Sequence, residues 1–197
     1  MHLTSEQRLD DGTLERTFTL GGIPGILWTP AWPSAATPAP LILLGHPPLG
    51  LRAMYPRLVA RARRFAADGF ATATIELPGS GDRPRWPAAE RARADLRRAR
   101  EAGEPVSDEL ADALVLPLVD RAVPEWQAAL DALLALPGIG GPVGYSGGVI
   151  SIGIRLAVVE PRIAASVLFA GDAAARFFAR HLRLTPEQRA RLDAPAT

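Results

Sequence analysis

The 197-residue sequence contains no cysteine and no lysine. Without cysteine the chain can form neither a disulfide nor a thiolate metal site, and its three scattered histidines do not predict a protein-built zinc centre. All 22 cationic side chains are therefore arginines, and 21 acidic side chains nearly balance them. This near-neutral composition does not indicate a nucleic-acid-binding protein.

Long apolar segments are also absent. Residues 1–6 are polar and contain no apolar signal core, and no apolar run is long enough to cross a bilayer. We therefore expect a cytoplasmic protein without a membrane partner. The length favours a single domain, residues 1–197, and a hydrophobic content of 48% is sufficient for a core.

The pattern of apolar residues predicts a sheet. Residues 14–20 alternate between apolar and polar side chains, and residues 23–29 continue extended after two glycines, which predicts an antiparallel hairpin. Short apolar runs at residues 41–44, 70–77 and 164–170 are typical of parallel strands that are covered on both faces.

Apolar residues at helical spacing predict a helix between the first and second of these runs. It begins at Pro56, where a missing N–H has no consequence, and ends at Gly69. Its Arg57, Arg61 and Arg64 are expected to face water. A strand, a helix and a strand of these lengths form a right-handed crossover within a parallel sheet.

The segment of residues 83–136 is longer than one crossover helix needs. Its pattern predicts three helices, at residues 88–102, at residues 108–116 and from Pro124 onward. The surplus either lies over the strand ends as a cap or extends the crossover. A further amphipathic helix is predicted at residues 173–182.

Gly144-x-Ser146-x-Gly148 has the spacing of a nucleophile elbow. In an elbow, a serine lies on a sharp strand-to-helix turn and has a strained backbone, and the flanking glycines remove side chains that would collide with the strand and the helix. An apolar strand precedes the motif and a buried-looking helix, residues 149–159, follows it. The alternative is an incidental glycine-rich turn.

Together these features resemble an α/β-hydrolase, near the bacterial esterases and dienelactone-hydrolase-like enzymes. Four features match in the family's order: the opening hairpin, Gly45-His46 after the third strand, Pro78-Gly79-x-Gly81-Asp82 after the fourth, and the serine motif after the fifth. The resemblance implies a mostly parallel sheet of about six strands with helices on both faces, a three-layer α/β sandwich.

The resemblance also implies acyl transfer from a carboxylic ester or lactone to water, through an acyl-enzyme and without a cofactor. Ser146 would be the nucleophile and the Gly147 N–H one oxyanion donor. The second donor would come from residues 47–50, where two prolines lack an N–H and leave Leu49 or Gly50. The predicted oxyanion and substrate-binding residues are Gly147, His46, Leu49 and Tyr145.

The acid and the base of the triad have one candidate each. His181 is the one histidine after the serine and would be the base, or else a helix side chain near a helix C-terminus. Asp172 would be the acid, or else a helix N-cap. His46 would be a hydrogen-bonding residue of its loop, and His2 would lie in a tail.

This incomplete match leaves three hypotheses. The chain is an active serine hydrolase, a non-catalytic binding or assembly module, or a hydrolase completed in trans by a dimer partner. The family has two more strands after the sixth, whereas here residues 170–173 lead directly to the closing helix. We therefore expect residues 166–169 at the sheet edge, covered either by a second copy or by the helix of residues 172–182.

Overall fold

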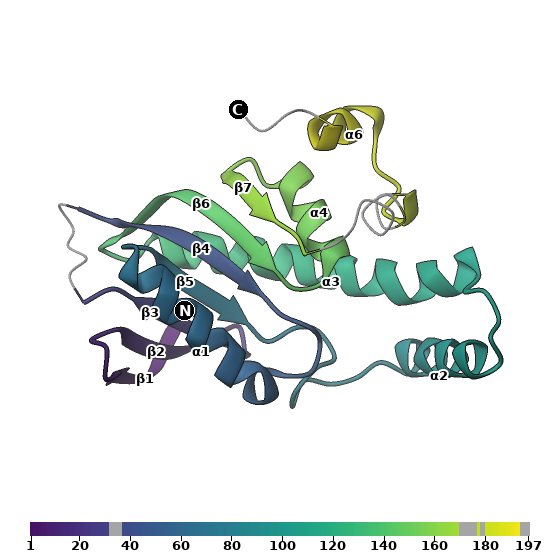
Figure 1. Cartoon of the computed structure of the whole chain (residues 1–197), viewed down its shortest axis with the longest axis horizontal. Helices are drawn as coiled ribbons and strands as arrows, with labels where there is room; N and C mark the ends of the chain where they lie inside the picture. Colours follow the sequence, from purple (N-terminus) through teal and green to yellow (C-terminus); the bar gives the residue numbers. More distant parts are fainter. Residues whose placement is uncertain (32–36, 170–176, 178–179, 194–197) are drawn as a thin grey trace.

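A computed structural model describes residues 1–31, 37–169, 177 and 180–193. One seven-stranded sheet forms its centre, with strand order β1-β2-β3-β5-β4-β6-β7 (Figure 1). The strands are β1 His2–Arg8, β2 Leu14–Leu20, β3 Ile23–Thr29, β4 Ala39–Gly45, β5 Ala71–Ile75, β6 Ile139–Gly147 and β7 Ile163–Val167. The helices are α1 Leu51–Ala67, α2 Pro87–Glu101, α3 Asp108–Leu134, α4 Ile150–Val159 and α6 Pro186–Asp193.

The sheet is mixed, and the prediction of a mostly parallel sheet of six strands is wrong on both counts. Strands β1, β2, β3 and β5 pair antiparallel in that order, while β5, β4, β6 and β7 pair in parallel. The additional strand is β1, which contains His2. All of its residues are exposed, so no apolar alternation marks it as a strand. Its pairing with β2 includes an ion pair from Arg16 Nε to Glu6 at 2.7 Å.

Helices cover both faces of the sheet, as predicted. On one face, Ile26 of β3 and Leu44 of β4 pack against Leu58 of α1. On the other face, Leu43 of β4 belongs to the core that contains Trp126 of α3 and residues of α4. The alternation of side chains along each strand sends neighbours to opposite layers, which produces the three layers.

Helix α1 begins earlier than predicted, at Leu51, and Pro56 lies inside it. The reason is a tertiary contact, because Glu76 Oε2 accepts the Leu51 N–H at 2.8 Å. A carboxylate from the end of β5 therefore supplies the acceptor that the first turn of a helix lacks. Nothing in the local sequence indicates this contact.

Helix α3 is one helix of 27 residues, and the prediction that it is two separate helices is wrong. It continues through Pro117 and Pro124, because an apolar stripe that includes Val119, Val123 and Trp126 is buried along its length. Its first turns and α2 lie side by side and project beyond the sheet (Figure 1). Its C-terminal half packs on the sheet as a crossover helix does. No helix among the described residues has the length and apolarity needed to span a membrane.

Strand β7 lies at the edge of the sheet, as predicted. Its last residue, Val167, is 55% exposed, and Phe169 beyond it is 75% exposed. No residue of β7 is buried, so the prediction that this strand is covered on both faces is wrong. Most of the predicted helix at residues 173–182 lies outside the described residues. Of its described members, Phe177, Arg180 and His181 are helical and Leu182 lies in a turn.

Candidate functional site

The predicted strand-to-helix turn is present at the end of β6. The strand ends at Gly147, the chain bends at Gly148, and α4 begins at Ile150. The positive backbone angles fall on the two glycines, with φ of 76° at Gly147 and 83° at Gly148, while Ser146 is an extended strand residue. The expectation of a strained backbone at the serine is therefore wrong, because the glycines that follow it make the turn.

The last glycine of the motif is required by a close approach of two strand ends. A Cβ on Gly148 would lie 2.6 Å from Gly45 Cα and 2.8 Å from His46 N. The first glycine is different, since a Cβ on Gly144 would make ordinary contact with Ile42 at 3.6 Å. Collision therefore explains only the second glycine of the pattern.

Ser146 faces α1, where Arg61 holds it. Arg61 Nη2 donates to Ser146 O at 2.7 Å and to Ser146 Oγ at 2.9 Å. Arg61 Nη1 donates to Gly45 O at 3.1 Å, so one guanidinium bridges the ends of β4 and β6. Burial lowers the pKa of Arg61 below its ordinary value. Ser146 itself is 7% exposed.

Arg61 was predicted to face water, and the structure corrects this. The sequence did contain a signal, because Met54, Leu58, Arg61 and Phe65 follow one another at intervals of four, three and four residues. That spacing places them on one face of a helix. An arginine within an apolar helical stripe indicates a cation that faces the protein.

A pocket of about 630 Å³ lies over Ser146. Its floor is formed by the ends of β4 and β6, and one wall by α1. The lining residues are Gly45, Pro47, Met54, Arg57, Leu58, Arg61, Arg64, Phe65, Asp68, Ser146, Gly147, Gly148 and Phe169. This position, outside the carboxyl ends of parallel strands, is where open α/β sheets bind ligands.

In the predicted oxyanion loop, residues 47–50, one of the two candidate N–H donors already forms a hydrogen bond within the loop. The Leu49 N–H donates to Pro47 O at 2.7 Å, while its side chain is 65% exposed. His46 is buried, and its ring nitrogens lie 2.7 Å from Pro47 O and 3.0 Å from Ile75 O. His46 therefore makes the loop hydrogen bonds expected of it. Gly147 lines the pocket.

Tyr145 lies on the opposite face of β6 from Ser146. Its buried ring packs edge-on against Trp126 with centroids 6.0 Å apart. Burial raises the pKa of Tyr145 well above its ordinary value. Tyr145 does not line the pocket of about 630 Å³, and its ring belongs to the core. It lines, together with Ser146, a smaller pocket of about 260 Å³.

The candidate base lies with α3 and not with the serine. His181 is 4% exposed, and its Nδ1 lies 2.8 Å from Asp112 Oδ1. Fourteen residues of α3, about 21 Å of helix, separate Asp112 from Trp126, the residue that packs behind the serine strand. None of the three histidines lines the pocket.

His181 has two further neighbours. Its Nε2 lies 3.6 Å from Asp108 Oδ1, and its ring lies 4.4 Å from the Phe177 ring, centroid to centroid. The hydrogen bond from His181 lowers the pKa of Asp112. The candidate acid Asp172 lies outside the described residues. Sequence reasoning missed Asp112, because 69 residues separate it from His181.

The loop after β5 is organised by Glu76, which is 5% exposed. Ser80 Oγ donates to Glu76 Oε1 at 2.5 Å, and a Cβ on Gly81 would lie 2.4 Å from Glu76 Oε2. Arg83 donates to Glu76 O at 2.8 Å and forms two bonds with Glu125 at 2.6 and 2.7 Å. Gly81 therefore makes room for a carboxylate that supports α1.

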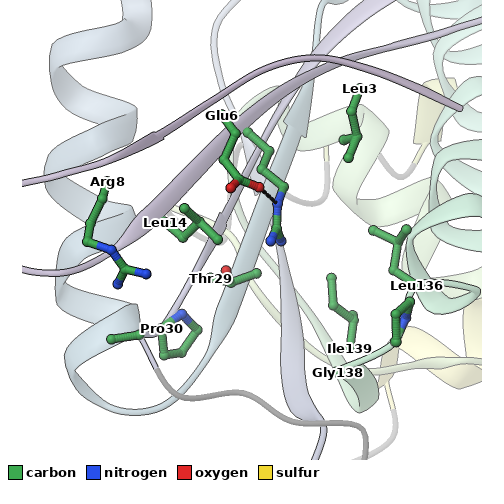
Figure 2. Close-up of a pocket in the computed structure, with 12 residues that line it drawn as sticks. Leu3, Glu6, Arg8, Leu14, Thr29, Pro30, Leu136, Gly138 and Ile139 are labelled. Atoms are coloured by element: carbon green, nitrogen blue, oxygen red, sulfur yellow. Dashed lines mark hydrogen bonds and ion pairs between the residues drawn. The ribbon is translucent and has the colours of Figure 1, made fainter.

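A second hollow, of about 340 Å³, lies at the other end of the sheet (Figure 2). Its wall carries the Glu6–Arg16 ion pair, and Ile139, the first residue of β6, lines it (Figure 2). Ser146 is seven residues further along β6, about 23 Å away at the usual rise of a strand. This hollow is separate from the serine and contains none of the predicted site residues.

No protein-family model and no curated protein sequence matches the chain. Solved structures do match. A cold-adapted esterase from an Arctic intertidal metagenomic library superposes with a TM-score of 0.59 at 24% identity, over 92% of this chain and 74% of that one. Acetyl xylan esterase 1 from Thermoanaerobacterium gives a TM-score of 0.53 at 14% identity, over 96% of this chain and 58% of that one.

The chain has the α/β-hydrolase fold. Est1E from Butyrivibrio proteoclasticus, solved with ferulic acid, shares this fold with a TM-score of 0.50 at 15% identity. The match covers 76% of this chain and 50% of that one. The chain thus spans between half and three quarters of the length of these three neighbours.

Proposed function

We propose that this α/β-hydrolase domain hydrolyses carboxylic esters or lactones, with Ser146 as the nucleophile. The observation that supports this most is the position of Ser146, at the carboxyl end of β6, in a pocket and directly before a glycine turn into a helix. In hydrolases of this fold, that position carries the nucleophile. Two proteins named as esterases share the fold.

The proposed reaction has two steps. Ser146 Oγ bonds to the carbonyl carbon of the substrate, the alcohol leaves, and water then releases the acid from the acyl-enzyme. The serine proton requires an acceptor, and Arg61 cannot be that acceptor because a guanidinium has no free lone pair to offer. No histidine lines the pocket, so we expect turnover about 10²–10⁴-fold below that of an enzyme with a positioned base.

Labelling with a fluorophosphonate probe tests this proposal without requiring a substrate. We expect a single adduct on Ser146, seen by intact mass and peptide mapping, and no adduct in Ser146→Ala. Ser151→Ala, which removes another serine of the same segment, is the control and should label as the wild type does. A wild-type protein that takes up no probe, or a label on another residue, would refute Ser146 as the nucleophile.

A non-catalytic binding module is the second candidate. Two contacts favour it: Arg61 donates a hydrogen bond to Ser146 Oγ, and His181 is buried against Asp112. Equal hydrolysis of nitrophenyl acetate by wild type and Ser146→Ala, together with retained ligand binding, would favour this candidate.

Completion in trans by a dimer partner is a separate proposal, and it requires His181 to leave its buried position. Mixing Ser146→Ala with His181→Ala should then restore activity that neither variant has alone. Absence of rescue would count against it.

A further inference from the structure

Three arginines of α1, Arg57, Arg61 and Arg64, line the pocket over Ser146. None of them forms an ion pair with a described residue, whereas nine other arginines in the described part of the chain do. The acidic residue in the lining is Asp68, at the end of α1. The pocket therefore has an excess of positive charge in a chain whose overall charge is only +1.

Arg61 is the most constrained of the three. It is partly buried, and its described partners are the neutral oxygens of Gly45 and Ser146. Hydrogen bonds from a guanidinium to an anionic oxygen are stronger than those to neutral acceptors. An oxyanion that enters the pocket can therefore replace Ser146 Oγ as an acceptor of Arg61, while the two carbonyl bonds remain.

The rest of this wall is apolar. Met54, Leu58 and Phe65 lie on the same face of α1 as Arg61 and line the same pocket. The volume of about 630 Å³ is within the usual range of small-molecule sites. A ligand that satisfies both parts of the wall has a charged head and an apolar chain.

We propose that the substrate of the Ser146 pocket is an amphiphilic anion, with a carboxylate or phosphate bound by Arg57, Arg61 and Arg64 and an apolar chain on Met54, Leu58 and Phe65. That this anion is a substrate rests on the proposed ester hydrolysis, whereas its binding in the pocket does not. Binding moves Arg61 to the ligand and releases the serine hydroxyl, so the pocket selects charged esters.

Calorimetric titration of Ser146→Ala tests the binding without any turnover. The probes are hexanoate, hexyl phosphate and neutral 1-hexanol, which share one chain and differ in the head. We expect at least one anion to bind about tenfold more tightly than 1-hexanol, and its affinity to fall between about 0.02 and about 0.5 M salt. The first two probes show whether a carboxylate or a phosphate is preferred.

The decisive variant is Arg57→Gln with Arg64→Gln, because both side chains are exposed and have no described partner to lose. We expect it to weaken anion binding about tenfold and to leave 1-hexanol binding unchanged. The matched control is Arg52→Gln, an exposed arginine of the same helix that lies outside this pocket. Equal affinity for 1-hexanol and both anions, or an unchanged affinity in the double variant, would overturn the proposal.

The two proposals fail separately. Anion binding without a fluorophosphonate adduct on Ser146 would retain the anion site and remove the hydrolase. An adduct on Ser146 without any preference for anions would retain the hydrolase and remove the anion site.

Discussion

Gly148→Ala tests the geometry of the strand-to-helix turn directly. Gly148 has φ of +83°, and an added Cβ would lie 2.6 Å from Gly45 Cα and 2.7 Å from Gly45 C. A left-handed backbone costs about 1–2 kcal/mol for a residue other than glycine, and forcing backbone atoms apart costs about 1–3 kcal/mol more. We therefore expect the free energy of unfolding to fall by about 2–5 kcal/mol, a large part of the stability of a typical domain.

Two other glycines separate the two contributions. Gly69 has φ of +87° with no atom within 4 Å of an added Cβ, so Gly69→Ala should show the backbone cost alone, about 1–2 kcal/mol. Gly144 has no positive φ, and an added Cβ would make only ordinary contacts with Ile42 and Ala165, so Gly144→Ala should change stability little.

Urea unfolding followed by tryptophan fluorescence measures all three variants, and fluorophosphonate labelling reports the site. Labelling should be lost in Gly148→Ala and kept in Gly69→Ala. A Gly148→Ala protein as stable as Gly69→Ala would show that the two strand ends do not approach each other as described, and the account of the turn would be wrong.

Three further predictions concern single contacts. The hydrogen bond from Arg162 lowers the pKa of Glu160 from 4.5 to about 2, so the stabilisation by this contact is complete above about pH 4.5 and is lost as the pH falls toward 2. The free energy of unfolding of Glu160→Gln should therefore depend less on pH in this range than that of the wild type, and identical pH profiles would contradict the contact. Tyr145→Phe should leave Ser146 labelling unchanged, because the ring lies on the other face of β6. A large loss of labelling would show that Tyr145 contributes to the site. His181→Ala should lower the free energy of unfolding, because it removes a buried ring and one of the two side-chain partners of Asp112, the other being Arg183. The labelling rate should be unchanged, and a strong drop in labelling would instead identify His181 as the base.

Much of the fold could be predicted from local patterns. Alternation in β2 and β3 and the apolar runs of β4 and β5 report which faces are buried, and that is set by the residues themselves. The apolar run of β7 correctly predicted a strand, but none of its residues is buried. The elbow motif likewise predicted the turn between β6 and α4. The exposed strand β1 was missed, because a strand that buries neither face has no apolar period, and only its hydrogen-bond partner β2 defines it.

The site was less predictable because its contacts join distant segments. Arg61 reaches Ser146 across 85 residues, and Asp112 reaches His181 across 69. Spacing alone indicated a serine, a loop histidine and a candidate base. It could not show that the base is paired with α3, or that an arginine holds the serine.

The sequence by itself determined an α/β chain with a serine before a glycine turn, since periodicity and glycine placement act over a few residues. The tertiary structure alone decided where α1 begins, which residue of the turn carries the positive φ, and which side chain the serine meets. These depend on a carboxylate, a strand end and a guanidinium that are brought together only when the sheet is assembled.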